Sequence, residues 1–103
     1  MRGMNDLLRQ AQIMQRKMSK LQEDLAERSV EATAGGGMVT VVCTGAQEIK
    51  SITIDKSVVE AGDVEMLQDL VLAAVNDAVK RAKEMSQSEM QALTGGVNIP
   101  GLF

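Results

Sequence analysis

Apolar residues in the last third of the chain recur at the spacing of a helix. Between residues 63 and 96 they fall three and four positions apart, which places their side chains on one face. Asp63 suits the N-cap and Gly95 the C-terminal stop, so the pattern predicts one helix of roughly 30 residues, about 45 Å long. The residues of this face are Leu67, Leu70, Val71, Ala74, Val75, Ala78, Ala82 and Met85.

The first half of this helix is apolar on more than one side, because Met66, Leu72 and Ala73 widen the face. Such a helix must be covered on several sides, and a chain of 103 residues has little with which to cover it. A second copy of the chain is the simplest cover. We therefore predict a homodimer with an interface formed by Leu67, Leu70, Val71, Ala74, Val75 and Ala78.

A second helical pattern occupies residues 5–28, with Asn5 or Asp6 as the expected cap. Apolar residues alternate spacings of three and four over about three heptads, which is the seam of a coiled coil. The seam fits a weak coiled coil, or packing on the C-terminal helix of the same or the other subunit. Its residues are Met4, Leu7, Ala11, Met14, Met18, Leu21 and Leu25.

The segment between the two helices has the pattern of β-strands. SVEATA, MVTVVCT and QEIKSITI alternate polar and apolar residues or carry β-branched residues. Gly35, Gly36 and Gly37 suit a three-residue hairpin loop, and residues 44–46 suit a second turn. Residues 55–62 then link the sheet to the C-terminal helix.

Composition narrows the possible chemistry. The chain has one aromatic residue, Phe103, no histidine and one cysteine, Cys43. One protomer therefore cannot form a disulfide or a Cys/His zinc site, and we expect no catalytic residue, metal or cofactor. Cys43 is in phase with Val39 and Val41, which predicts a buried apolar side chain. The alternative, a reactive thiol, lacks a histidine to activate it.

Hydropathy gives no sign of a membrane segment. No apolar run approaches the ~20 residues of a membrane span, and the N-terminus has no signal-peptide pattern. We therefore expect a soluble cytoplasmic protein.

Charge is distributed unevenly along the chain. The net charge is −3, but residues 1–20 hold five basic residues against one acidic residue, a net +4. Residues 21–103 therefore carry −7. A basic N-terminal segment joined to an acidic remainder permits contact with a polyanion despite the negative total.

Arg2, Arg9 and Arg16 recur every seven residues, opposite the N-terminal apolar seam, and Lys17 and Lys20 flank this line. An ordinary solvated face is the alternative interpretation. However, basic residues stabilise the C-terminal end of a helix, and these lie in the first half. Helix stability does not explain that order, whereas phosphate binding does.

A second basic cluster lies in the C-terminal helix at Lys80, Arg81 and Lys83. Asp77 and Glu84 are four residues from Arg81 and Lys80, so two of the three cations are expected to be neutralised by ion pairs along the helix. Only Lys83 lacks such a partner. The cluster remains a second candidate for contact with phosphate groups.

Two blocks of sequence resemble the YbaB/EbfC family of bacterial nucleoid-associated proteins. They are GGGMVTVVCTGAQEIKSITID and, further on, LQDLVLAAVNDAVKRAKEM with the later EM and LTGG. The resemblance implies an α+β fold, an α-β-β-β-α protomer with a three-stranded antiparallel sheet and two long helices. It also implies a homodimer that binds double-stranded DNA in the cytoplasm, at the bacterial nucleoid. We expect one domain over residues 1–96 and a short, flexible tail over 97–103, or else a tail that docks on a partner.

The near absence of aromatic residues favours duplex DNA over single strands, which are held by stacking on aromatic rings. A duplex is held through its phosphates by lysine and arginine. We therefore predict backbone binding without a small-molecule substrate or a membrane partner. The alternative is a dimeric protein-interaction adaptor or a small chaperone-like clamp, which fits the seam and the eight methionines. The predicted DNA contacts are Arg9, Arg16, Lys17, Lys20, Lys80, Arg81 and Lys83.

Overall fold

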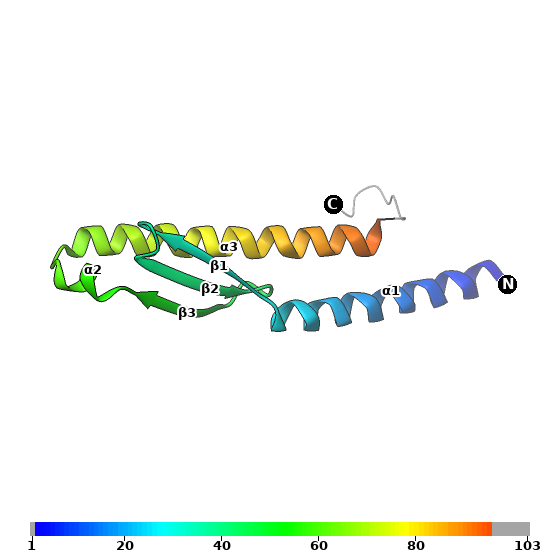
Figure 1. Cartoon of the computed structure of the whole chain (residues 1–103). Coiled ribbons are helices and arrows are strands. Elements are labelled where there is room, and N and C mark those ends of the chain that lie inside the picture. Colours follow the sequence, from blue (N-terminus) through cyan, green and yellow to red (C-terminus); the bar gives the residue numbers. More distant parts are fainter. Residues whose placement is uncertain (1, 96–103) are drawn as a thin grey trace.

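The structure, a computed structural model, describes residues 2–95 as three helices and three strands (Figure 1). Their order confirms the α+β class and the α-β-β-β-α arrangement, with one short helix added before the last. The predicted tail, residues 97–103, lies outside the described residues. The elements are α1 (Arg2–Glu27), β1 (Ser29–Ala34), β2 (Val39–Thr44), β3 (Ile49–Ile54), α2 (Lys56–Glu60) and α3 (Val64–Thr94).

The three strands form an antiparallel sheet in the order β1-β2-β3, with β2 in the centre. Ala34 pairs with Val39, so the first hairpin loop is Gly35–Met38, one residue longer than predicted. The three glycines have φ of 64°, 68° and 94°, values that favour residues without a Cβ. Met38 therefore belongs to the loop and β2 begins one residue later.

Helix α3 lies across β1 and β2 (Figure 1), and the core of the protomer forms between them. Ala74, Ala78 and Ala82 are completely buried against this sheet, together with Val41 and Cys43 of β2. Because alanine side chains are small, the helix axis approaches the strands closely. Much of the apolar face of α3 therefore packs against the sheet of its own protomer.

Strand β3 lies beyond the cover of α3. Ile52 pairs with Val41 and therefore points to the same face of the sheet, yet 46% of Ile52 is exposed while Val41 is buried. The apolar face of the sheet consequently continues past the helix as a partly open strip. Ile49 and Ile54 flank Ile52 in this strip and are half-buried.

The ends of the helices follow the predictions in part. Asp63 caps α3 by accepting a hydrogen bond of 3.0 Å from the backbone N–H of Met66, and Gly95 is the C-cap. Helix α1, however, already begins at Arg2, so the predicted caps Asn5 and Asp6 lie inside it. A cap residue acts only where a helix ends, and each added helical residue gains a backbone hydrogen bond.

The predicted linker over residues 55–62 contains helix α2. Asp55 caps it, because its carboxylate accepts hydrogen bonds from the backbone N–H and the hydroxyl of Ser57, both 2.9 Å. Val58 anchors the helix and is 2% exposed. The segment links the sheet to α3 as predicted, and it does so through a short helix that the sequence pattern did not indicate.

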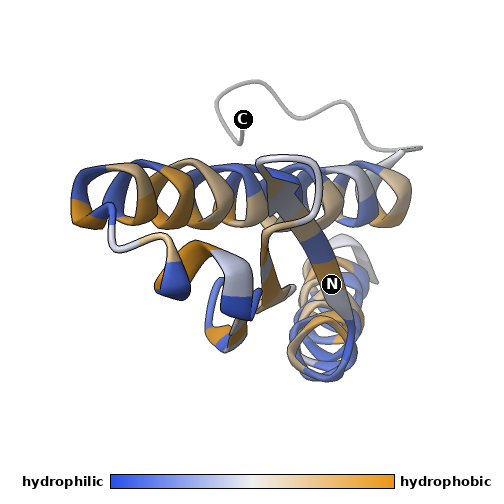
Figure 2. Ribbon diagram, turned by 60° about the vertical axis from the view of Figure 1, so that its left-hand side comes forward, coloured by the Kyte–Doolittle hydropathy of each residue, from blue (hydrophilic) through white to orange (hydrophobic). Residues whose placement is uncertain are grey.

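We call α1 the arm, and the sheet with α2 and α3 the body. Leu25 at the root of the arm is 3% exposed, whereas Met4, Leu7 and Leu8 in its outer half are 66%, 68% and 58% exposed. Figure 1 shows the arm extending away from the sheet, and Figure 2 shows it nearly end-on, separate from α3. Within the protomer the predicted seam is buried at its root and half-buried at Met14 and Met18, and the molecule reaches 72 Å in length.

Candidate nucleic-acid interface

Four exposed cations lie on the polar side of the arm, and we call them the basic line: Arg9, Arg16, Lys17 and Lys20. The burial of Leu25 and the partial burial of Leu21 turn the apolar seam toward the body. Because Arg9 and Arg16 lie opposite this seam on the helix, they face solvent. The arm therefore presents its cations away from the rest of the protomer.

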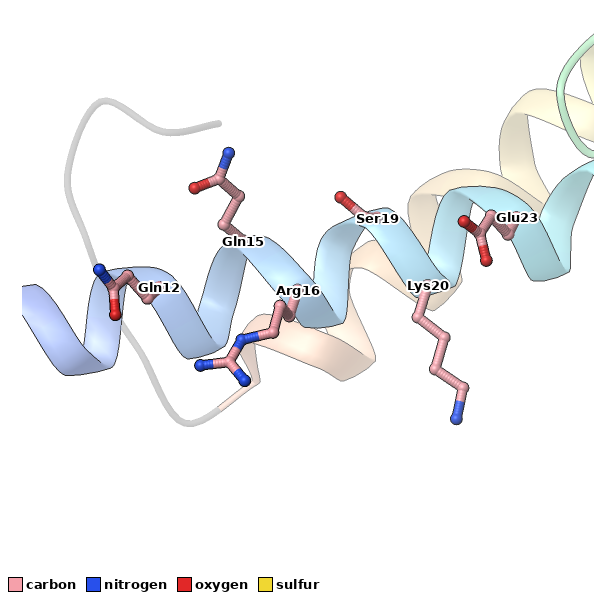
Figure 3. A pocket seen from close by; sticks show the side chains of 6 residues that line it. All are labelled: Gln12, Gln15, Arg16, Ser19, Lys20 and Glu23. Carbon is pink, nitrogen blue, oxygen red and sulfur yellow. The ribbon is translucent and has the colours of Figure 1, made fainter.

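Figure 3 shows how part of the basic line is displayed along an open groove. Arg16 and Lys20 project to one side of the helix, whereas Gln15 and Ser19 project to the other. The two cations are one helical turn apart, about 6 Å along the axis. The groove is lined by Gln12, Gln15, Arg16, Ser19, Lys20 and Glu23.

The cations of the basic line are not neutralised within the part of the chain that the structure describes. Over residues 2–95 the ion pairs join Arg28 to Glu89 and Arg81 to Asp77, and neither includes the basic line. An exposed cation without an acidic partner keeps its full attraction for phosphate.

The second cluster is organised differently. Arg81 forms the predicted ion pair with Asp77, with Nε and Oδ2 3.1 Å apart, but the described residues show no pair between Lys80 and Glu84. Lys80 follows buried Ala78 by two residues, roughly 200° around the helix, and so faces away from the sheet. All three cations are exposed, with Lys80 on the outer face of α3, and the cluster lies on a different helix from the basic line.

The structure also changes the predicted dimer interface. Ala74 and Ala78 have no exposed surface left in the protomer, because both pack on its own sheet, so a second copy cannot bury them further. Leu67, Leu70, Val71 and Val75 are only half-buried and keep surface for a partner. Sequence reasoning missed the β3 strip around Ile52, although the alternation in QEIKSITI was its signal.

Cys43 is buried, as predicted, and burial raises the pKa of its thiol.

Among the described residues, no group of three histidine, cysteine, aspartate or glutamate side chains is arranged to hold a metal ion. In the same part of the chain, none of the helices combines the length and the apolar character needed to cross a bilayer.

A compact α+β body that carries an exposed basic helix defines a class of small proteins that present cations to an anionic partner. Comparison with known families makes the class specific. A model described as the YbaB/EbfC DNA-binding family matches residues 1–97, and the chain belongs to this family. This confirms the resemblance found in the two sequence blocks.

Individual relatives agree with the family. The chain is 58% identical over 102 residues to a nucleoid-associated protein of Acetivibrio thermocellus, covering 98% of this chain and 90% of the relative. It is 58% identical over 101 residues to one from Desulforamulus reducens, covering 98% and 96%. The crystal structure of the uncharacterized protein HP0035 from Helicobacter pylori shares the fold, with a TM-score of 0.78 and 29% identity, covering 86% of this chain and 94% of that one.

Proposed function

We propose that this protein binds double-stranded DNA as a homodimer, mainly through the phosphate backbone, and that it acts at the bacterial nucleoid in the cytoplasm without catalysing a reaction. Membership of a DNA-binding family and relatives named nucleoid-associated proteins support this proposal. The observation that carries it is the basic line: four exposed cations on an arm, without acidic partners among residues 2–95.

Duplex DNA suits this surface better than a single strand. The basic line offers charge, and the groove beside it offers amides and a hydroxyl, but the only aromatic residue of the chain is Phe103. Base stacking therefore has no platform on the arm, whereas phosphate contacts need none. A single-stranded oligonucleotide of equal length should compete poorly with duplex, and equal competition would contradict backbone binding.

A homodimer is supported by the apolar surface that one protomer leaves open. This surface includes the β3 strip around Ile52, and Val71 and Val75 on α3, which are only half-buried. A second copy would cover it and would place two arms in one molecule. Light scattering at micromolar concentration should give about twice the chain mass; a monomer at every concentration would contradict the proposal.

The salt dependence of binding tests the proposed function directly. If Arg9, Arg16 and Lys17 each meet one phosphate in each subunit, the dimer makes about six contacts and log K falls with log salt at a slope of about −5. A gel-shift titration on duplex DNA at two salt concentrations measures this slope.

A dimeric adaptor or a small chaperone-like clamp is the second candidate, favoured by the exposed Met4, Leu7 and Leu8 of the arm. An apolar protein interface responds little to salt. Absence of duplex binding at low salt, together with salt-independent capture of an unfolded polypeptide, would favour this candidate.

A further inference from the structure

The arm is fastened to the body most tightly at its root, residues 21–28, while Met14 and Met18 further out are only half-buried. Leu25 is buried at the root, and the carbonyl of Arg28 accepts a hydrogen bond of 2.9 Å from the backbone N–H of Gly45 in the β2–β3 turn. Residues 3–13 of the arm are exposed throughout. The direction of a helix of 26 residues is thus determined by a few contacts at one end.

Gly45 is the tightest of these contacts. A Cβ at this position would lie 2.5 Å from the carbonyl oxygen of Leu25, 2.9 Å from Cε of Met85 and 3.0 Å from Cβ of Leu25. The glycines with positive φ among the described residues are found elsewhere, so the backbone of Gly45 itself would accept a side chain. The exclusion comes from the arm, whose backbone oxygen cannot yield unless the helix moves.

A third contact joins the end of the arm to α3. Arg28 Nη1 lies 3.0 Å from Glu89 Oε1, and both side chains remain partly exposed. Such a pair adds little free energy of folding, but it fixes which part of α3 the root touches. The β2–β3 turn, Met85 and Glu89 thus hold the root from different sides.

We propose that this junction is an elbow that sets the direction of the arm, and that Gly45 is a positioning residue for DNA binding. This inference rests on the proposed function, because the position of the basic line matters only if the arm contacts DNA. Gly45 touches no DNA itself. It acts by allowing the arm backbone to approach the β2–β3 turn.

The expected displacement of the arm follows from treating it as a rigid rod that turns about its root. An alanine Cβ would need its distance to the Leu25 oxygen to grow from 2.5 Å to the ordinary 3.4 Å, a shift of about 0.9 Å. With a pivot at Arg28, about 4.5 Å from Leu25, the arm rotates by roughly 0.2 rad. Arg9 lies about 28 Å from the pivot and moves by roughly 5–6 Å, more than the axial rise of about 3.4 Å between successive phosphates of one strand.

The test measures the direction of the arm without DNA. Spin labels are placed at Gln10→Cys on the arm and Gln91→Cys near the C-terminal end of α3, both exposed, while buried Cys43 stays unlabelled. Doubly labelled chains are diluted with unlabelled chains, so that only distances within a chain are recorded. Gly45→Ala should change this distance by up to about 5 Å. Gly3→Ala is the matched control, because nothing lies within 4 Å of its Cβ.

Duplex affinity is then measured on the same variants without labels. Gly45→Ala should bind about tenfold more weakly and lower the salt slope by roughly 2, one lost contact in each subunit, whereas Gly3→Ala should bind like the parent. A changed distance with weaker binding supports the proposal. An unchanged distance overturns the elbow, and a changed distance with parental affinity overturns the role of Gly45 in DNA binding.

Failure of the proposed function gives a different result. If the parent chain binds no duplex DNA, the proposed DNA-binding function and the role of Gly45 in DNA binding are both wrong. The spin-label distance alone then decides whether the elbow exists. If Gly45→Ala does not fold, Met85→Ala is measured in its place. Met85→Ala removes a side chain from the elbow and leaves the close approach of the Leu25 backbone to Gly45 unchanged. Its distance distribution should broaden, and a distribution as narrow as that of the parent overturns the proposal.

Discussion

The arm and the body use the same kind of apolar stripe in opposite ways. In α3 the centre of the stripe is formed by three alanines, Ala74, Ala78 and Ala82, that are completely buried against β1 and β2. In α1 it contains larger residues, yet Met4 and Leu7 are about two-thirds exposed. Helical spacing therefore predicts that a face exists, while the size of its side chains and the position of the sheet decide what covers it. Burial holds the body together, and the arm is held by its root.

The largest expected effect comes from placing a charge in the body. Ala78→Asp buries a carboxylate between α3 and the sheet with no cation to pair it, since Ala78 is completely buried in the core. This costs several kcal/mol, a large share of the stability of about 5–15 kcal/mol that is typical of a domain. We expect a variant that is unfolded at room temperature, measured by circular dichroism.

The same change in the arm sharpens the comparison. Ala11→Asp alters an exposed seam position and should change the free energy of unfolding by about 0.5 kcal/mol or less. If Ala11→Asp unfolds the protein as Ala78→Asp does, the outer arm is covered in solution and the contrast between the two regions is wrong.

The next effect concerns DNA and not stability. Changing the four residues of the basic line to alanine should weaken binding to all duplex sequences alike and flatten the salt slope, because phosphate contacts carry no sequence information. Dimerisation and folding should survive, since these side chains lie off the apolar seam. Gel shifts at several salt concentrations and light scattering measure both properties.

The second cluster supplies the comparison for this experiment. The triple change of Lys80, Arg81 and Lys83 to alanine should cost less DNA affinity, because Arg81 is already paired and Lys80 points away from the sheet. It should cost some helix stability, since the pair with Asp77 is lost. If the basic-line variant binds duplex normally as a dimer, the arm is an ordinary solvated surface and another face holds the DNA.

A smaller effect is expected in the reactivity of thiols. Cys43 lies in the core and its pKa is raised by burial, so a thiol reagent should reach it only when the body opens. Gln10→Cys on the arm should react at least about a thousandfold faster at neutral pH. Similar rates at the two positions would mean that the body opens far more readily than its packing indicates.

The smallest effect is a pH dependence at α2. Hydrogen bonds from the backbone N–H and hydroxyl of Ser57 lower the pKa of Asp55 in the folded protein. The ionised cap therefore stabilises the fold at pH values above the pKa of the unfolded chain, and this contribution is lost as the pH falls through the folded pKa. The difference in melting temperature between the parent and Asp55→Asn should shrink in acid; a constant difference would contradict the cap.

Much of the fold was predictable because its signals are local. The alternation in SVEATA and VTVVCT indicates strands with one buried face. Asp63 indicates the start of a helix, because its side chain accepts the capping hydrogen bond. Helix α2 escaped prediction because it has five residues and two adjacent valines, which favour strands. The start of α1 was predicted too late in the chain. Asparagine and aspartate are preferred as helix N-caps, so Asn5 and Asp6 suggested a helix start although both lie inside the helix.

The candidate site was predictable to a different degree. The seven-residue recurrence of Arg9 and Arg16 places them opposite the seam, and the structure leaves both exposed. The partner that buries Ala78 was not predictable. An apolar face on a helix shows that the face will be covered, but its sequence is the same whether the cover is the sheet of the same protomer or a second chain. The elbow at Gly45 was equally hidden, because a close backbone approach between distant segments leaves only a glycine in the sequence.

The elbow also has a consequence for how the protein is made. The partners of Leu25 at this junction, Gly45 and Met85, follow it by 20 and 60 residues along the chain. Chains emerge from the ribosome N-terminus first, and a helix of 26 residues is long enough to form by itself. The arm is therefore synthesised before anything exists to hold its root. Until Gly45 and Met85 emerge, Leu25 is exposed as well as Leu7 and Leu8, so the nascent arm presents its whole apolar seam to other chains.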